Sequence, residues 1–259
     1  MALQRAASAA WDDNAWWHPG GLAWTRPANI AVAGDGWVWK DGDTAALLGA
    51  VTAEAVDVAV GLGALYVVHH EATPLPEVHG VPFSTDVRRP AEKIEPTPVP
   101  GVRLGQVEDA TAFIACHRAA WHPHALPFAT ARTFPDDATS AFDIVQWDVL
   151  RNDAWFDPDL VVVAYEDIAP VASCITWYDP ASGAAEIEPL GVVPQARGRG
   201  IARLVTQESV RRVASRGGRE VVVRPRGDAD YPVPLAVYLA CGFVINQRER
   251  VFRLPSSPS

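Results

Sequence analysis

A strand-like run that passes directly into a glycine-rich turn and a long helix is the feature that most constrains the fold. The segment is VVPQARGRGIARL, residues 192–204. Gly198 and Gly200 remove side chains where the chain turns. Backbone N–H groups at the helix N-terminus can therefore point at one spot, where the helix dipole also favours negative charge. Arg197 and Arg199 add positive potential. The segment predicts an α/β fold with an anion cradle suited to a pyrophosphate.

Other known motifs do not fit this segment. A dinucleotide-binding turn needs a third glycine, which GRGIAR does not have, and its strand normally comes early in the domain. The Gly-Lys-Ser/Thr ending of a Walker loop is absent from the sequence, and no serine lies in a G-x-S-x-G turn of the hydrolase type. On this motif alone, a glycine-rich turn without a ligand remains an alternative.

The charge distribution points to an anionic ligand bound at one place. The 22 Lys and Arg residues against 31 Asp and Glu residues give a formal net charge of −9, which argues against general nucleic-acid binding. Nine arginines but only two acids lie between Arg197 and Arg226, so that segment is basic and the remainder is strongly acidic. The acidic remainder favours a cationic partner. Ordinary surface charge on a helix is the alternative interpretation.

Nothing in the sequence suggests a membrane or an oxidising compartment. No run approaches eighteen consecutive apolar residues, and the opening segment MALQRAASAAWDDNAWW has no apolar core of signal-peptide length. The three cysteines, Cys116, Cys174 and Cys241, are too few and too scattered for a disulfide framework or a zinc module. We therefore expect a soluble cytoplasmic protein with no membrane partner.

A proline-rich segment, RRPAEKIEPTPVP at 88–100, predicts a stiff extended linker and a division into regions 1–95 and 96–259. Residues 1–87 hold six of the ten tryptophans and read as a hairpin, a short helix and a strand. A fragment of this size buries only part of its own surface. We expect this smaller α/β region to pack on the rest of the chain.

The remainder alternates regularly between predicted strands and helices. Strands are expected at 102–108, 159–167, 170–178, 184–193, 221–225 and near 243–253, and helices at 109–121, 139–152, from Arg199 onward, and at 232–241. The run VVVRP at 221–225 is apolar on both faces, which is typical of a buried parallel strand. Gly217 and Gly218 are expected to end the long helix.

Two segments resemble motifs of the GNAT superfamily of acyl-CoA-dependent N-acetyltransferases. QARGRG at 195–200 resembles that family's Q/R-x-x-G-x-G/A signature, and VYLACGF at 237–243 resembles its Y-x-x-x-G-F element. The order of elements from 101 to 253 matches as well. The resemblance implies a mixed, mostly antiparallel central sheet flanked by helices. It also makes the N-terminal region a candidate for a degenerate half of a duplicated GNAT domain, with no second cofactor site.

The resemblance further implies acetyl-CoA as co-substrate, with no metal. Backbone amides of the signature and the first helical turn would hold the pyrophosphate, and the strand before it would hold the pantetheine arm. The cofactor-binding candidates are Leu190, Val192, Val193, Gln195, Arg197, Gly198, Arg199, Gly200 and Ala202. One departure is Tyr231, which stands where the family often has an asparagine.

Three residues are catalytic candidates. Tyr238 matches the position of the family's general acid, with a core aromatic residue as the alternative. Glu186 and Glu188 alternate with Ile187 and so share one face of their strand. Two carboxylates there are costly unless that face opens to a cleft, which makes them candidates for the base, Glu188 first. A solvated strand edge is the alternative.

The acceptor-binding candidates are Trp121, His122, His124 and Trp177, because the resemblance implies that the region after the first helix lines the acceptor pocket. For the two histidines, an exposed side chain without a role is the alternative. The predicted function is transfer of an acetyl group to a primary amine of a small, cationic molecule, by direct attack in a ternary complex. The alternatives are a non-catalytic acyl-CoA-binding or ligand-sensing module, and an acetyltransferase for protein or peptide amines. The sequence leaves the acceptor, the acyl length and a homo-oligomer open.

Overall fold

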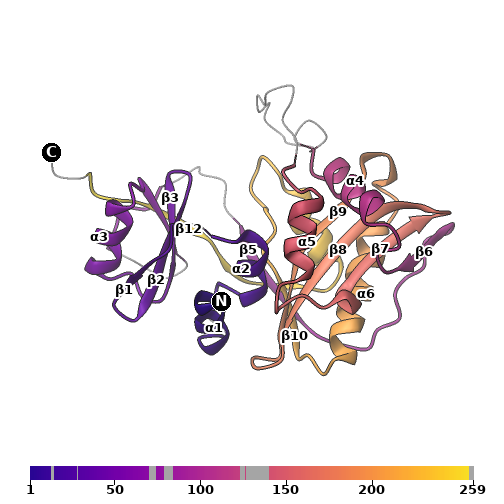
Figure 1. The fold of residues 1–259 in the computed structure, drawn as a ribbon, viewed down its shortest axis with the longest axis horizontal. Coiled ribbons are helices and arrows are strands. Elements are labelled where there is room, and N and C mark those ends of the chain that lie inside the picture. Colours follow the sequence, from indigo (N-terminus) through magenta and orange to yellow (C-terminus); the bar gives the residue numbers. More distant parts are fainter. Residues whose placement is uncertain are drawn as a thin grey trace.

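Two β-sheets, each flanked by helices, organise the fold (Figure 1). The computed structural model describes the chain except for residues 13–14, 28, 70–73, 79–83, 123–125, 127–139 and 257–259. Strand order is β11-β5-β10-β9-β8-β7-β6 in the larger sheet and β1-β2-β3-β4-β12 in the smaller. The prediction of a mixed, mostly antiparallel α/β fold with a smaller N-terminal region packed on it is confirmed.

The larger sheet contains the predicted parallel strand. Its strands are β5 (Thr85–Pro90), β6 (Val102–Gly105), β7 (Val161–Glu166), β8 (Ala169–Asp179), β9 (Ala184–Val192), β10 (Glu220–Val223) and β11 (Val244–Arg248). Neighbours are antiparallel except for β9 and β10. The side chains of β10 at Val221, Val222 and Val223 are buried, as the apolar run predicts.

Helices cover both faces of this sheet because its strands alternate between two cores. Val161 and Val163 of β7 pack with α4 (Ala110–Ala120) and α5 (Ile144–Arg151), whereas Val162 packs with α6 (Ile201–Ser215) and α7 (Val233–Ala240). This is the period of two expected for a strand. Asp109 and Asp143 cap α4 and α5 through hydrogen bonds from backbone N–H groups at 2.8 and 2.9 Å.

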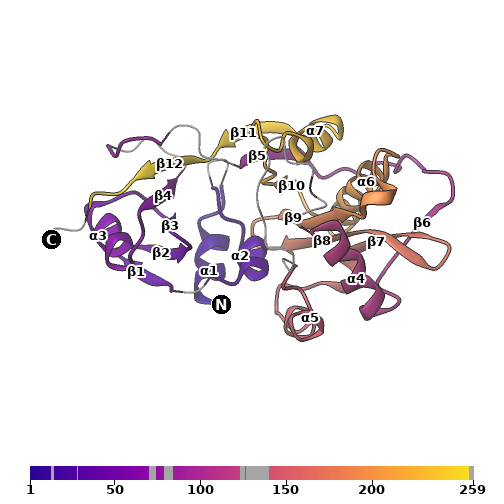
Figure 2. The ribbon, with the colours of Figure 1, turned by 90° about the horizontal axis from the view of Figure 1, so that it is seen from above.

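The smaller sheet lies beside the larger one, with two helices between them (Figure 2). Its strands are β1 (Ala31–Ala33), β2 (Gly36–Asp41), β3 (Thr44–Leu48), β4 (Tyr66–His69) and β12 (Arg250–Arg253). Helix α3 (Ala53–Gly61) packs on one face, while α1 (Ala2–Ala9) and α2 (Pro19–Thr25) pack between the sheets. Trp39 and Leu22 meet in this layer, and Trp17 donates its indole N–H to the Leu47 carbonyl at 2.8 Å. The tryptophan-rich segment thus joins the two sheets.

Each sheet also takes a strand from the other side of the predicted boundary at residues 95 and 96. Strand β5, which precedes residue 95, lies between β10 and β11, and β12, near the C-terminus, pairs with β4. The predicted linker at 88–100 was therefore wrong at its start, because residues 88–90 belong to β5. The strand escaped notice because Asp86 and Arg88 interrupt its apolar pattern; they are buried as a pair, 2.9 Å apart. The sheets do not separate at residues 95 and 96, and the division into the regions 1–95 and 96–259 stays a prediction.

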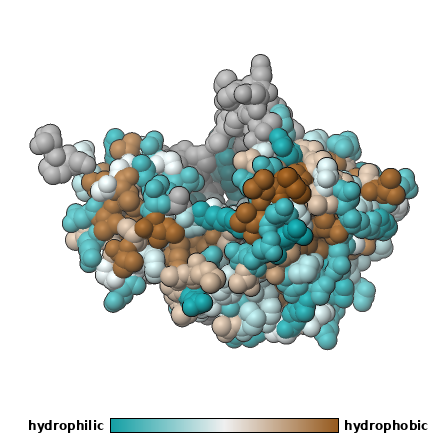
Figure 3. Space-filling model, in the orientation of Figure 1, coloured by the Kyte–Doolittle hydropathy of each residue, from teal (hydrophilic) through white to brown (hydrophobic). Residues whose placement is uncertain are grey.

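The surface over α5 is apolar. Trp147 and Leu150 face inward, while Ile144, Val145 and Val149 are exposed and contribute to the apolar patch over α5 in Figure 3. Within the described residues, no helix combines the length and the apolar character needed to cross a membrane.

Candidate active site

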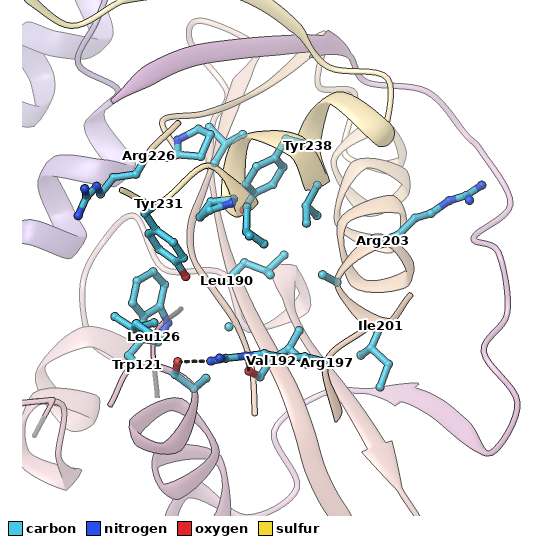
Figure 4. Close-up of a pocket in the computed structure, with 18 of the residues that line it drawn as sticks. Trp121, Leu126, Leu190, Val192, Arg197, Ile201, Arg203, Arg226, Tyr231 and Tyr238 are labelled. Carbon is cyan, nitrogen blue, oxygen red and sulfur yellow. Dashed lines mark hydrogen bonds between the residues drawn. The ribbon is translucent and has the colours of Figure 1, made fainter. Parts of the chain in front are cut away.

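A cavity opens where β9 and β10 diverge (Figure 4). The strands pair in parallel over three positions only, from Glu220 with Ala184 to Val222 with Glu186. Beyond that point a cavity of about 530 Å³ lies between them. β9 is also irregular there: Ile187 pairs with Thr176 and Leu190 with Cys174, so that β9 has one extra residue against β8. The backbone of β9 between Glu188 and Val192 is therefore free of β10 and lines the cavity.

The glycine-rich turn forms one end of this cavity. Gly198 and Gly200 have φ of 74° and 85°, in the left-handed region that glycine adopts without strain. No side chain caps α6 at Gly200, so the N–H groups of the first turn have no side-chain acceptor. These groups and the helix dipole favour an anion, as the sequence predicts.

The arginines of the turn do not all face the cavity. Arg197 lines it and donates hydrogen bonds to the carbonyls of Val192 and Ala120 at 3.1 and 3.0 Å, so that it ties β9 to the end of α4. Arg199 forms an ion pair with Glu166 at 2.5 Å. Arg203, in the first turn of α6, lines the cavity with the inner part of its side chain, while its guanidinium points away from the cavity and donates to the Thr97 hydroxyl at 3.2 Å (Figure 4).

The structure brings most of the predicted site residues to this one cavity. Those that line it are Trp121, Glu188, Leu190, Val192, Arg197, Gly198, Gly200, Ala202 and Tyr238. The predicted residues that are not among the lining residues are His122, Trp177, Glu186, Val193, Gln195 and Arg199. His124 lies outside the described residues.

One predicted acceptor contact, Trp177, and the nearby His117 both lie in buried surroundings. Trp177 is fully buried and donates its indole N–H to the Glu188 carbonyl at 2.6 Å, so it supports the β9 backbone from behind. His117, on α4, is buried beside Trp24 and Phe142, and burial lowers its pKa to about 4. Trp177 lies in the core of the sheet and not in the pocket wall, because burial of its large apolar ring is favourable there.

The catalytic candidates have protonation properties suited to acid–base chemistry. Burial and the neighbouring Glu186 charge raise the pKa of Glu188 to about 7, against the opposing effect of Arg224. Burial also raises the pKa of Tyr238 well above its ordinary value, so its hydroxyl keeps its proton. One group can therefore accept a proton near neutral pH while the other holds one. Tyr238 and Tyr231 lie on the α7 side of the cavity, and Trp121 and Arg197 on the opposite side (Figure 4).

Arg224 and Arg226, which follow β10, are the main lining residues that sequence reasoning missed. Arg224 binds the Glu186 carboxylate, and Arg226 forms a two-point ion pair with Asp228 at 2.7 Å. A signal was available, since ligands commonly bind at the carboxyl ends of parallel strands. The run VVVRP predicts the strand, but the sequence pattern marks both arginines only as part of the basic segment.

The fold and the cavity define the class of protein. Residues 124–243 match the model of the Acetyltransferase (GNAT) family. Among solved structures, a tandem GNAT protein from the clavulanic acid biosynthesis pathway is similar at a TM-score of 0.60 and 14% identity, over 99% of this chain and 93% of that one. A GCN5-related N-acetyltransferase from Sphaerobacter thermophilus has a TM-score of 0.57 at 16% identity, over 86% of this chain and 78% of that one.

Two curated relatives carry the name mycothiol acetyltransferase. The protein from Amycolatopsis mediterranei is 29% identical over 152 residues, 56% of this chain and 45% of its own length. The one from Mycolicibacterium smegmatis is 27% identical over 169 residues, 61% of this chain and 52% of its own length. The chain thus spans about half the length of the curated relatives it matches. Residues 124–243 thus match a GNAT domain, as the motifs indicate, and the fold of the whole chain is similar to that of a tandem GNAT protein.

Proposed function

We propose that this chain transfers an acetyl group from acetyl-CoA to the primary amine of a small, cationic molecule in the cytoplasm. The observation that carries the proposal is the shape of the cavity. It runs from the uncapped N-terminus of α6, along the unpaired backbone of β9, to Glu188 and Tyr238. An anion site, a row of free backbone groups and an acid–base pair therefore share one space.

The residues present fit acetyl-CoA. Gly198 and Gly200, with the first turn of α6, would hold the pyrophosphate through backbone N–H groups. Leu190 and Val192 would present backbone groups to the pantetheine arm. Gly191 is also needed there, since a Cβ on it would lie 2.8 Å from both Ala120 Cβ and Trp121 Nε1. When bound, acetyl-CoA supplies an electrophilic thioester carbonyl and a thiolate leaving group.

In the proposed mechanism Glu188 takes a proton from the acceptor ammonium, because only the free amine is nucleophilic. The amine nitrogen then forms a bond to the acyl carbon, the carbon–sulfur bond breaks, and the nitrogen releases its second proton to solvent. Tyr238 donates its proton to the sulfur, and solvent restores both groups. The carboxylate of Glu188 suits this role because its raised pKa of about 7 makes it a stronger base than an ordinary carboxylate while it is still partly ionised at neutral pH.

Two measurements test the proposal. Calorimetry measures acetyl-CoA binding, and a thiol-detecting assay measures CoA release across a panel of small amines, headed by amines related to mycothiol because of the two curated relatives. Binding together with amine-dependent thiol release is expected. Binding without release from any small amine, and with release from lysine-bearing peptides, would favour protein acetylation. Binding with no release at all would favour an acyl-CoA-binding module.

A further inference from the structure

Arg224 connects the tryptophan-rich N-terminal segment to the candidate active site. The Arg224 guanidinium donates to the Trp16 carbonyl and to Glu186 Oε1. It also lies over the Trp17 ring, 4.9 Å from its centroid. Its side chain is 11% exposed and lines the cavity that contains Glu188. Arg224 thus contacts the N-terminal half on one side and the site on the other.

Glu186 lies behind Glu188 and depends on Arg224 for compensation of its charge. It is 1% exposed, and its second oxygen, Oε2, lies against Gly21, where a Cβ would come within 2.2 Å of it. His18 Nδ1 is 3.8 Å away but accepts the Gly20 N–H, while the Nε2 side faces the Ala184 carbonyl at 3.2 Å. That arrangement is satisfied by neutral His18, and burial lowers its pKa to about 3. Arg224 is therefore the cation that balances Glu186.

Other groups face this cluster from the surrounding elements: His18, Asp86, Arg88, Cys174, Tyr238 and Glu249. Asp86 and Arg88 compensate each other at 2.9 Å, and Glu249 accepts the Ser84 N–H at 2.7 Å. Cys174 and Tyr238 keep their protons because burial raises the pKa of each. The carboxyl groups of Glu186 and Glu188 therefore share one nearby guanidinium, that of Arg224, whose charge also acts on Glu249.

We infer that Arg224, held by Trp16 and Trp17, is a positioning residue through which the N-terminal half sets the charge state of Glu188. The inference rests on the proposed role of Glu188 as the base. Repulsion between the two carboxylates favours a proton on one of them, whereas Arg224 favours the charged form of both. The N-terminal half thereby tunes the site without contributing a group that touches substrate.

Charge variants of the two partners give opposite predictions for the acidic limb of the pH–rate profile. Glu186→Gln removes the like charge and leaves Arg224 to Glu188, so the limb should move down by about one pH unit. Arg224→Gln removes the cation, so the limb should move up by about one unit, and Arg224→Lys should restore it. A merely structural role would lower turnover in both variants without moving the limb in opposite directions. Limbs that stay in place, or that move the same way, would overturn the inference.

A matched pair of tryptophans tests the link to the N-terminal half. Trp17→Leu should shift the limb in the same direction as Arg224→Gln but less, whereas Trp17→Phe keeps a ring under the guanidinium and should not. Trp11 is the control: Arg88 lies over its ring, also at 4.9 Å, but Arg88 pairs with Asp86. Trp11→Leu should leave the limb unchanged. Equal shifts for Trp11→Leu and Trp17→Leu would contradict the assignment.

A second readout does not need turnover. Carbon-13 NMR of glutamate-labelled full-length protein, with the Glu188 signal assigned by its loss in Glu188→Gln, follows the titration of this carboxyl directly. The same opposite shifts are expected for the Glu186 and Arg224 variants. If no amine is acetylated, the proposed function fails, and the NMR titration still decides the inference. If acetylation occurs but the titration does not move, only the inference fails.

Discussion

The chain contains two strand–helix–strand units of the same topology, β3–α3–β4 in the N-terminal half and β9–α6–β10 in the C-terminal half. In each, a helix connects two parallel strands that pair over three positions: Thr44 with Tyr66 through Ala46 with Val68, and Ala184 with Glu220 through Glu186 with Val222. The backbone framework is thus the same. The two units differ in how the helix begins and in what lies between the strands once their pairing stops.

The helix N-termini have opposite chemistry. In α3 the Thr52 hydroxyl accepts the Ala55 N–H at 3.1 Å, and Glu54 places an acid in the first turn. In α6 the residue at the start is Gly200, no side chain caps the helix, and Arg203 follows. A capped, acidic start disfavours an anion, whereas an uncapped start beside an arginine favours one.

The two units also differ in what fills the space between their parallel strands. Beyond the β3–β4 pairing, the buried side chain of His69 reaches across and makes a 2.9 Å hydrogen bond with the Gly49 carbonyl. Beyond the β9–β10 pairing lies the cavity that contains Glu188 and Arg224. One topology therefore gives either bridged strands or a ligand-sized space, and the side chains at the ends of the parallel strands decide which.

The largest expected effect tests whether the two halves are separable at all. A fragment of residues 96–259 lacks β5, so β10 and β11 each lose their shared neighbour, and β12 loses β4. We expect this fragment not to fold, as measured by soluble yield and a cooperative melting transition. A fragment of residues 84–259 keeps β5 and should therefore give a higher soluble yield than the shorter fragment. Cooperative melting of the shorter fragment would show that the exchange of strands is dispensable.

The next effect concerns chemistry, which we place in the C-terminal unit alone. Tyr238→Phe keeps the buried ring and its contact with Phe243 but removes the hydroxyl. Turnover in the thiol-release assay should fall by about 100-fold, the lower end for loss of a general acid. The melting temperature should hardly change. Undiminished turnover would reduce Tyr238 to a core residue.

The anion cradle can be tested against a glycine with matched geometry. Gly200→Val should weaken acetyl-CoA binding at least tenfold in calorimetry, or about 1.4 kcal/mol, because a side chain enters the cradle. Gly217 has φ of 84° against 85° for Gly200 and has no atom within 4 Å of its Cβ position, but it lies at the other end of α6. Gly217→Val should therefore cause the same backbone strain as Gly200→Val but leave acetyl-CoA binding unchanged. Equal binding by the two variants would remove the cradle assignment.

A pH effect on stability is expected from Glu188, which belongs to the β9–α6–β10 unit. Folding raises the pKa of Glu188 from its ordinary value to about 7, so the folded state binds more protons than the unfolded state between these values. The stabilising contribution of this difference is complete at lower pH and is lost as the pH rises through about 7. Glu188→Gln should therefore gain melting temperature over the wild type at pH 8 and lose that advantage at pH 5. A constant difference across this range would argue against a raised pKa.

The smallest effect sharpens the contrast between the helix starts. Thr52→Ala removes the cap of α3 and should cost about 1 kcal/mol in the free energy of unfolding, measured in urea. Acetyl-CoA binding should stay the same, because we assign no anion site to α3. A change in affinity without a change in stability would show that the two units are not specialised as we propose.

Much of the C-terminal half was predictable because its signals are local. The turn at Gly198 and Gly200 and the buried run of β10 depend on neighbouring residues, and the structure forms both. The predicted positions of Trp177 and the linker start were less successful. Trp177 became a core residue, and β5 looked polar because Asp86 and Arg88 compensate each other inside the sheet.

The strand–turn–helix unit and the parallel strand beside it follow from local sequence, since backbone conformation and side-chain period are set within a few residues. The exchange of β5 and β12 between the sheets, and the link that Arg224 makes from Glu186 to the Trp16 carbonyl, arise only in the folded chain. The last two contacts span 38 and 208 residues of sequence. No local pattern encodes such pairings, because the charge of a buried glutamate is compensated by whichever cation the folded chain brings to it.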